Sequence, residues 1–228
     1  MHYAMSDLHG CYGKFLQMLE KIHFCNADTL FFLGDAVDRG PDGIALVQDL
    51  MGRANVMPLL GNHEDMFRRT VRAKYGRPPL LERSAARKNY VNWTRNNGGE
   101  VTWKSFLALS MDEQRAIARW LEALPYYYEL TVGGRDFLLV HAGVGSYAPE
   151  KDPALCSVYD FIWGRMDYGR TYYQNRYLVT GHTPTILIDP SARGRILQRN
   201  NHICLDCGAV FLGTLGCICL ETLEEFYV

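Results

Sequence analysis

The sequence predicts an α/β protein built around one core. Over the first 76 residues, short apolar runs alternate with helical patterns, as in folds whose helices cover a sheet. Beyond about residue 124 the chain becomes rich in strand-like segments. At 228 residues it can bury one sizeable core. We therefore expect a single domain over residues 1–228, with an insertion that breaks the strand–helix alternation between about 76 and 124.

The first half is expected to contain three strands, each followed by a helix. Phe15, Met18, Leu19 and Ile22 recur at helical spacing and place the first helix. Gly52 is a plausible end for the second helix, and acidic Glu64 lies at the favourable start of the third. The expected strands are 3–5, 29–33 and 56–60, and the second and third helices are about 42–52 and 64–74.

The stretch 76–124 is predicted to be a helical insertion lying over one side of the sheet. Pro78-Pro79 marks a turn, 110–113 forms a capping box, and Pro125 ends the helix that follows it. The segment 66–97 carries nine basic residues against only Glu82. Such a run is usually a solvated face, although beside a cleft it attracts polyanions. The basic residues are Arg68, Arg69, Arg72, Lys74, Arg77, Arg83, Arg87, Lys88 and Arg95.

The second half is predicted to be mainly β-structure. Segments 126–132 and 135–140 flank Gly133-Gly134, a two-residue hairpin signal. Another strand is expected at 177–180. The segments 202–205 and 215–220 are expected to pair as a C-terminal hairpin that closes the sheet.

Composition excludes several classes of protein. The formal net charge is -1, with 48% hydrophobic and 21% charged residues, so neither nucleic acid nor a membrane is an expected partner. The first strand begins near Tyr3 and leaves no room for a signal peptide, which favours a cytoplasmic location. Seven cysteines then indicate reduced thiols. Four of these cysteines form the motifs Cys204-x-x-Cys207 and Cys217-x-Cys219. Both motifs lie in segments predicted to be strands, so buried thiols are preferred to a zinc site.

Five apolar runs end with a residue able to bind a metal ion. If their strands share one sheet system, their carboxyl ends gather these side chains at one edge. A single such ending has little weight, because a lone histidine is usually structural, but five are hard to explain by coincidence. The endings supply Asp7 and His9, Asp35, Asn62 and His63, His141, and His182.

The chemistry of this set favours two divalent ions. Carboxylate, imidazole and amide donors without thiolate suit manganese first, with iron or zinc as alternatives. Seven donors are too many for one tetrahedral ion, so two ions sharing a bridging carboxylate are more economical. Such a pair, about 3.5–4 Å apart, would activate a bridging water and stabilise in-line displacement at phosphorus.

The motifs in the chain resemble those of the phosphoprotein phosphatase branch of the calcineurin-like metallophosphoesterases. The resemblance implies a fold of two packed mixed sheets flanked by helices, an α-β-β-α sandwich with a helical insertion. It runs in order from about residue 3 to 213. Trp93-x-x-Asn96-Asn97-Gly98-Gly99 and 162–165 are similar to signatures of short bacterial and phage serine/threonine phosphatases. The family motifs are Asp7-Leu8-His9-Gly10, Gly34-Asp35-Ala36-Val37-Asp38-Arg39-Gly40, Gly61-Asn62-His63-Glu64, His141-Ala142-Gly143 and Gly181-His182.

The resemblance implies roles for individual residues. His63 would be the general acid, oriented by Asp38, whose carboxylate is expected to keep the imidazole protonated. Arg39 and Arg165 would clamp the phosphate together with Asn62, since a guanidinium fork fits phosphoryl oxygens. One metal would be held by Asp7, His9 and Asp35, and the other by Asp35, Asn62, His141 and His182.

Other residues are assigned structural roles. We expect His2, His23 and His202 to be surface or structural residues. Glu64 is expected to be a helix-start carboxylate and not a ligand. Trp93 and Trp163 are expected to be packing anchors, although either would also fit the wall of the cleft.

Three functions remain open from the sequence. The first is hydrolysis of phosphoserine or phosphothreonine, and of phosphotyrosine as an extension, by direct attack of a metal-bridging hydroxide, in phosphoproteins, peptides or small molecules. The second is hydrolysis of dinucleoside polyphosphates such as diadenosine tetraphosphate. An intact Asp38–His63 pair favours the ester, because a phosphoanhydride leaves as a stable anion. The third is a non-catalytic binding protein on the same fold. A monomer is expected.

Overall fold

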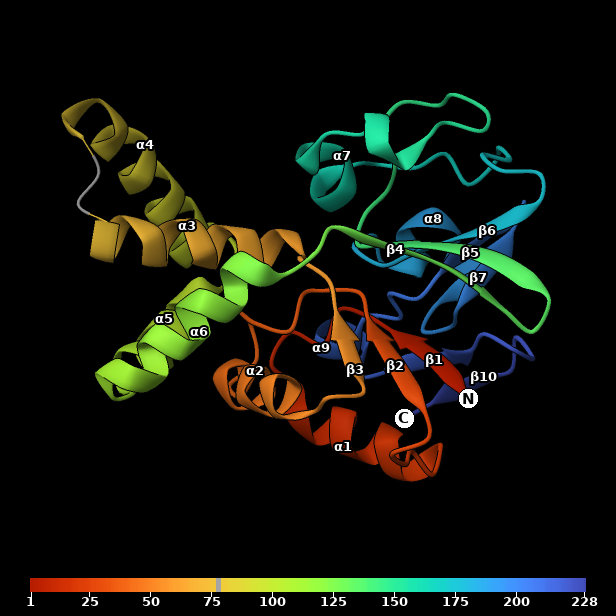
Figure 1. The fold of residues 1–228 in the computed structure, drawn as a ribbon, viewed down its shortest axis with the longest axis horizontal. Coiled ribbons are helices and arrows are strands. Elements are labelled where there is room, and N and C mark those ends of the chain that lie inside the picture. Colours follow the sequence, from red (N-terminus) through yellow and green to blue (C-terminus); the bar gives the residue numbers. More distant parts are fainter. Residues whose placement is uncertain (77–78) are drawn as a thin grey trace.

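The computed structural model describes residues 1–76 and 79–228. Pro78 of the expected proline turn and Arg77 of the basic run therefore lie outside the described residues. Strands and helices form two five-stranded mixed sheets with helices outside them, as Figure 1 shows. The predicted α/β fold class is confirmed.

The first sheet has the order β10-β9-β1-β2-β3. β1, β2 and β3 are parallel, whereas β9 pairs antiparallel with both β1 and β10. α1 (Tyr12–Lys21) and α2 (Gly43–Gly52) follow the first two parallel strands. The strands are β1 (His2–Met5), β2 (Thr29–Phe32), β3 (Val56–Pro58), β9 (Gly216–Cys219) and β10 (Glu225–Tyr227).

The second sheet has the order β4-β5-β6-β8-β7. β4 and β5 form the predicted hairpin around Gly133-Gly134, and β5, β6 and β8 are parallel. Its strands are β4 (Tyr127–Val132), β5 (Arg135–Val140), β6 (Arg176–Thr180), β7 (Leu197–Arg199) and β8 (His202–Cys204). The short helices near it are η2 (Pro153–Leu155), α7 (Val158–Trp163), α8 (Thr185–Ile188), η3 (Pro190–Ala192) and α9 (Ala209–Leu212).

The inner strands are buried on both faces, which explains why β1, β2 and β9 read as continuous apolar runs. Alternate residues of one strand enter different parts of the core. Ala4 packs with Phe137 and Ile218 in the layer between the sheets. Met5, one position along, packs instead in the layer that includes the helices.

The expected C-terminal hairpin is wrong. β8 pairs with β6 and β7 in the second sheet, whereas β9 pairs with β1 and β10 in the first. The segment between them crosses from one sheet to the other through α9. The hairpin partner of β8 is β7, joined by Asn200-Asn201, both with a φ of 55°. Two left-handed asparagines suit the type I′ turn that joins adjacent strands, so the sequence did contain this signal.

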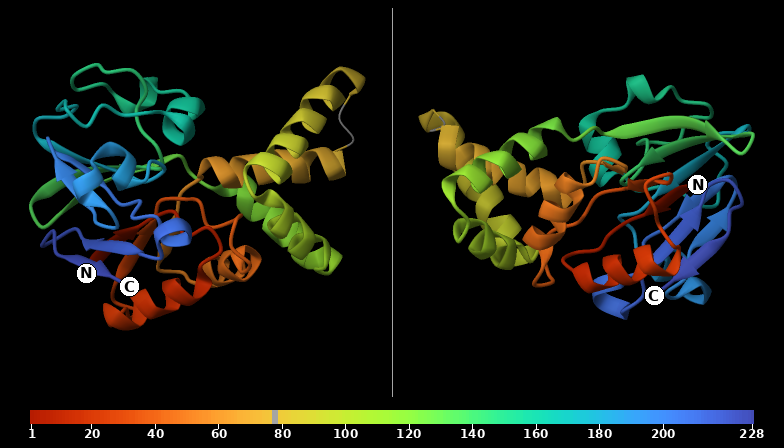
Figure 2. Two further views of the ribbon diagram at one scale, coloured as in Figure 1. Left: turned by 180° about the vertical axis from the view of Figure 1, so that it is seen from behind. Right: turned by 60° about the horizontal axis from the view of Figure 1, so that its bottom comes forward.

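The insertion does not lie over a sheet face as expected. Figures 1 and 2 show it standing to one side of the two sheets, and its helices pack chiefly on one another, on α2 and on α3 (Asn62–Gly76). The reason is an aromatic core of its own: Phe67 stacks on Trp93 at 5.3 Å between ring centroids and meets Phe106 edge-on at 5.1 Å. The preceding helix α3 supplies Phe67 to this core. The insertion comprises α4 (Leu80–Val91), the π-helical η1 (Asn92–Asn96), α5 (Gly99–Leu107) and α6 (Met111–Ala123).

Within the described residues, every helix is too short or too polar to cross a membrane.

We predict that Phe106→Ala destabilises the protein by about 3–5 kcal/mol, because removing a fully buried ring leaves a cavity. Phe106 is 0% exposed and contacts both Phe67 and Trp103. Urea unfolding followed by circular dichroism measures the change. The matched control is Leu107→Ala, one residue along and 43% exposed, for which we expect a change within about 0.5 kcal/mol. Equal losses in the two variants would contradict the aromatic core.

Candidate active site

The strand ends of both sheets meet at a pocket of about 210 Å³. β1 and β2 from the first sheet lead to His9 and Asp35, and β6 from the second leads to His182. The predicted gathering of strand ends is thus what the fold produces. Residues lining the pocket are His9, Asp35, Arg39, Asn62, His63, Asn97, Trp163, Arg165, His182, Pro184, Leu187, Asp206 and Phe211.

Asp35 lies between two groups of nitrogen donors. Its Oδ2 is 3.6 Å from Nε2 of His9, and its Oδ1 is 3.5 Å from Nε2 of His141. These separations are too long for hydrogen bonds. They match the distance of roughly 3.0–3.5 Å between two ligands that each stand about 2.1 Å from a shared ion. The two carboxylate oxygens therefore face different donor sets, as a bridging ligand requires.

Backbone carbonyls fix which nitrogen of each imidazole faces this space. Nδ1 of His141 donates to the Leu33 carbonyl at 2.7 Å, and Nδ1 of His9 donates to the Val37 carbonyl at 3.0 Å. In a neutral ring the other nitrogen, Nε2, is then a bare lone-pair donor. Nε2 of His141 lies 2.9 Å from Oδ1 of Asn62. Oδ1 of Asn62 also lies 3.0 Å from Nδ1 of His182, so one oxygen faces two imidazole nitrogens, as in a set of ligands that share a cation.

Burial adds to the case for a cation. Loss of solvent raises the pKa values of Asp7 and Asp35, because a buried carboxylate without a cation is costly. Burial lowers the pKa values of His9 and His182, which keeps both rings in the neutral form that ligands use. Asp7 accepts a hydrogen bond from the His182 backbone N–H at 2.9 Å. The donor set therefore fits divalent cations, and the individual ligand roles remain predictions.

The loops that present these residues are strained. Several predicted site residues have a left-handed backbone, which L-residues adopt at a cost of order 1–3 kcal/mol each. The surrounding contacts must hold them there. The residues, with φ between 43° and 74°, are Asp7, His9, Asp35, Asp38, Arg39 and His182.

Glu64 supplies much of that support, a role that the sequence reasoning missed. Its buried carboxylate accepts the backbone N–H groups of Asp35 at 2.7 Å, Ala36 at 2.8 Å and Gly61 at 3.1 Å. A Cβ on Gly61 would lie 2.2 Å from Oδ1 of Asp35, so only glycine allows the two loops to approach this closely. Glu64 is a helix-start carboxylate, as expected, that also joins the β2 and β3 loops.

Asp38 and His63 form the predicted pair. Oδ2 of Asp38 is 2.6 Å from Nδ1 of His63. The same carboxylate accepts the indole N–H of Trp93 at 2.6 Å and the hydroxyl of Thr102 at 2.7 Å. Both donors come from the insertion. Trp93 is thus the packing anchor expected from the sequence and a partner of Asp38 as well, whereas nothing in the sequence singled out Thr102.

The proton on this pair is not simply placed on the imidazole, as the sequence reasoning expected. Burial raises the pKa of Asp38 to about 7. Burial also lowers the pKa of His63 well below its usual range, with the nearby Arg39 guanidinium acting in the same direction. A proton shared along the short Oδ2–Nδ1 contact satisfies both groups. The Arg39 guanidinium, which can only donate, lies 3.1 Å from Nε2 of His63, so Nε2 is the acceptor here and can carry a proton only when Arg39 turns to an anion.

The two predicted clamping arginines both line the pocket. The guanidinium of Arg39 contacts Nε2 of His9 and lies 3.1 Å from Nε2 of His63. It also lies 5.0 Å from the centroid of the Phe211 ring. Arg165 donates to the hydroxyl of Thr183 at 2.8 Å. Asp206 and Phe211 were missed, because their positions depend on the chain crossing between the sheets.

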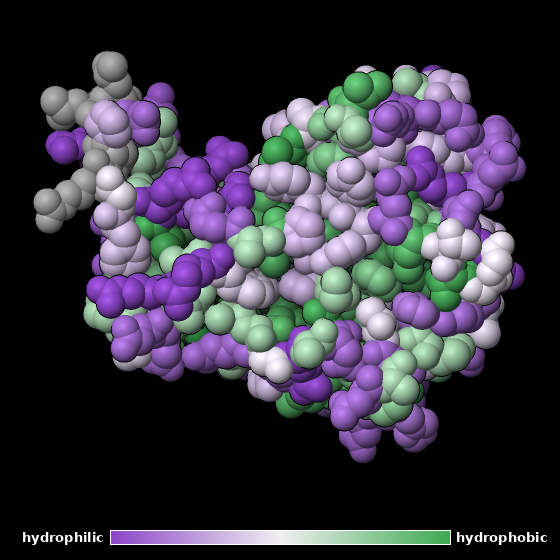
Figure 3. Space-filling view, viewed as in Figure 1, coloured by the Kyte–Doolittle hydropathy of each residue, from purple (hydrophilic) through white to green (hydrophobic). Residues whose placement is uncertain are grey.

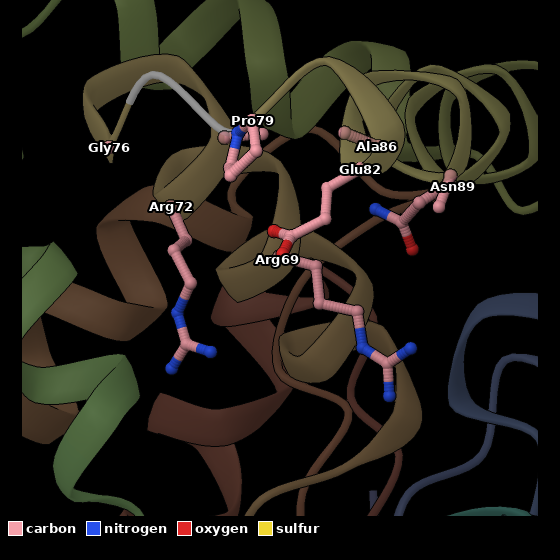
Figure 4. Close-up of a pocket in the computed structure, with 9 residues that line it drawn as sticks. Arg69, Arg72, Gly76, Pro79, Glu82, Ala86 and Asn89 are labelled. Atoms are coloured by element: carbon pink, nitrogen blue, oxygen red, sulfur yellow. The ribbon is translucent and has the colours of Figure 1, made fainter.

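None of the basic residues of the run that the structure describes lines the catalytic pocket, and several are paired with carboxylates. Arg69 pairs with Asp65 at 2.7 Å and Arg72 pairs with Glu122. Hydrophilic side chains gather over this part of the molecule in Figure 3. Between α3 and α4 lies a cavity of about 390 Å³, lined in part by Arg69, Arg72 and Glu82 (Figure 4). None of its lining residues belongs to the catalytic pocket.

Residues assigned structural roles mostly fill them. His202 is buried, not on the surface, and its ring stacks on Tyr168 with centroids 4.1 Å apart. Trp163 lines the catalytic pocket and meets His182 edge-on. The C-terminal cysteines are free thiols buried in the core, as preferred.

Sequence relatives carry names from nucleotide chemistry. A bis(5'-nucleosyl)-tetraphosphatase PrpE of the asymmetrical type, from Geobacillus sp. (strain WCH70), is 28% identical over 98% of this chain and 92% of its own length. A symmetrical bis(5'-nucleosyl)-tetraphosphatase from Acidovorax sp. (strain JS42) is 33% identical over 62% of this chain, which is 43% of that protein.

Solved structures share the fold. A putative diadenosine tetraphosphatase superposes with a TM-score of 0.67 at 18% identity, covering 100% of this chain and 92% of that one. A protein serine/threonine phosphatase from Saccharomyces cerevisiae, described as similar to human PP5, gives 0.62 at 15% identity, covering 100% and 78%. The calcineurin-like phosphoesterase family model matches residues 3–186, and the chain belongs to that family.

Proposed function

We propose that this protein is a metal-dependent hydrolase that cleaves a phosphoanhydride bond of dinucleoside tetraphosphates. The observation that carries the proposal is the pocket itself, in which imidazole nitrogens and an amide oxygen gather around Asp35 beside two guanidinium groups. The Geobacillus relative, which matches over 92% of its own length, is named for this substrate class. The proposal reverses the order of functions suggested by the sequence alone, which placed phosphoproteins first.

The side chains divide the work in this pocket. Divalent ions, manganese first, would be held by Asp7, His9 and Asp35 on one side and by Asp35, Asn62, His141 and His182 on the other. When bound, they supply charge neutralisation and an activated water.

Arg39 and Arg165 bind and orient the phosphoryl oxygens, with the amide of Asn62 beside them. His63 presents Nε2 to the leaving oxygen and gives it a proton. Asp38 positions the ring through its 2.6 Å contact with Nδ1.

The shape of the cleft supports a substrate longer than a monoester. By itself the catalytic pocket, at about 210 Å³, is smaller than the roughly 300–1,000 Å³ of typical ligand sites, so a longer substrate must extend beyond it. A neighbouring cavity of about 310 Å³ shares Arg165 and Leu187 with it and adds Arg199. Additional phosphates can extend from one guanidinium towards the next.

A second candidate is hydrolysis of phosphoserine, phosphothreonine or phosphotyrosine. One observation favours it: the Asp38–His63 pair is fully formed, with Trp93 and Thr102 supporting it. An alkoxide leaves poorly without a proton, so this arrangement gains most on an ester.

A side-by-side assay separates the two candidates. We expect the manganese-loaded protein to cleave diadenosine tetraphosphate with a larger kcat/KM than a phosphoserine peptide, and EDTA to abolish both activities. Chromatography of the products distinguishes adenosine monophosphate plus triphosphate from two diphosphates. Turnover of the peptide alone would favour the second candidate, and a metal-loaded protein that cleaves neither would refute both.

We predict that His63→Asn affects poor leaving groups most. The loss in kcat should reach about 100-fold or more on a phosphoserine peptide, because a general acid contributes roughly 10²–10⁴-fold. On p-nitrophenyl phosphate, whose phenolate leaves readily, we expect a loss below about tenfold. Steady-state kinetics on both substrates tests this, and equal losses would argue against the general-acid role.

We also predict that Trp93→Phe weakens catalysis through Asp38. Loss of the indole N–H removes a donor that lowers the pKa of Asp38, so the pH limb of kcat that belongs to the Asp38–His63 pair should move to higher pH. We expect kcat to fall about tenfold on poor leaving groups. Trp103→Phe is the matched control, since its ring stacks on Phe106 in the same cluster. A purely structural role would leave the pH profile of Trp93→Phe unshifted.

A further inference from the structure

An exposed aromatic ring stands at the mouth of the catalytic pocket. Phe211 lines that pocket, yet 66% of its surface is exposed. Leu187, on the same pocket, is 74% exposed. Isolated exposed apolar side chains are common on protein surfaces, but two beside a buried charged site are not explained by core packing.

The backbone around Phe211 holds the ring in this position. α9 lies between Gly208 and Gly213, whose φ values of 80° and 74° both need the left-handed region. Asp206 accepts the Gly208 N–H at 3.0 Å, and Ala209, the first residue of the helix, is buried. Phe211 therefore projects from an anchored turn.

The ring is also coupled to the predicted phosphate clamp. The guanidinium of Arg39 lies 5.0 Å from the centroid of the Phe211 ring, within the range of a cation–π contact. The same guanidinium reaches Nε2 of His63, 3.1 Å away. A phosphate held by Arg39 would therefore carry its attached group past the ring.

We propose that Phe211, with Leu187, forms a subsite for the nucleobase of the substrate. A nucleotide fits both parts of this pocket entrance, because it links an anion, which Arg39 would bind, to a flat ring, which Phe211 would stack on. Stacking of a base on an aromatic side chain contributes about 1–3 kcal/mol. The inference rests on the proposed function and extends it, since it names the group beyond the scissile phosphate that the protein recognises.

The test compares substrates with and without a base. Tripolyphosphate has phosphoanhydride bonds but no base, so the ratio of kcat/KM for diadenosine tetraphosphate to that for tripolyphosphate reports the subsite. For Phe211→Ala we expect this ratio to fall about tenfold, and for Phe211→Tyr to stay near the wild-type value. Leu155→Ala is the matched control, because Leu155 is 76% exposed and lies outside the catalytic pocket.

A binding measurement keeps this result separate from the proposed function. With p-nitrophenyl phosphate as reporter, the inhibition constant of adenosine monophosphate relative to that of inorganic phosphate should rise about tenfold in Phe211→Ala. If the wild type cleaves diadenosine tetraphosphate but both ratios are unchanged in Phe211→Ala, the subsite is overturned and the proposed function stands. A wild type that spares this substrate would overturn the function. Selective loss of phosphotyrosine-peptide turnover, with inhibition by adenosine monophosphate unaltered, would assign the ring to a peptide and refute the nucleobase proposal.

Discussion

The buried carboxylate of Glu64 is the interaction on which the arrangement of the pocket depends. It accepts N–H groups from the loop after β2 and from Gly61 after β3. Those hydrogen bonds hold Asp35 in a left-handed conformation that would otherwise relax. Because His63 directly precedes Glu64 on α3, the same hydrogen bonds also fix the backbone position from which the His63 imidazole extends. Burial raises the pKa of Glu64, while the backbone N–H groups oppose that rise and favour the carboxylate.

The insertion belongs to the pocket chemically, although it stands apart from the sheets. It reaches Asp38 with an indole N–H and a hydroxyl, and the Gly98 carbonyl accepts the backbone N–H of Arg39 at 3.1 Å. The aromatic core around Phe67 therefore does more than stabilise helices. It fixes the orientation of the Asp38 carboxylate, which is distant from the insertion in the sequence. The packing of the insertion is therefore linked to the acid–base pair.

The parts that the sequence predicted are those with local signals. Asp35 and His141 each follow an apolar strand, and parallel strands place such endings at one edge within each sheet, which was predictable. That the two edges face each other depends on the packing of one sheet on the other, which no local signal showed. Glu64 illustrates the limit: its position at a helix start was visible, but its partners 27–29 residues away were not. The C-terminal hairpin failed for a related reason. Two short apolar segments do not reveal whether they pair with each other or with more distant strands, and here the chain changes sheets at Gly208.

On the proposed function, different side chains of the pocket would respond to two properties of a substrate: the basicity of its leaving group and the group that its phosphate carries. In the proposed role His63 would act on the leaving oxygen, so its importance would grow as the leaving group becomes more basic. Phe211 lies beside Arg39 at the same pocket, where by our proposal it would contact the group that the phosphate carries. A phosphoanhydride needs little help from the first group, yet its nucleoside gains from the second. An ester of serine needs the first and gains little from the second. On the proposed function, the balance between these two side chains would set which substrate this protein prefers.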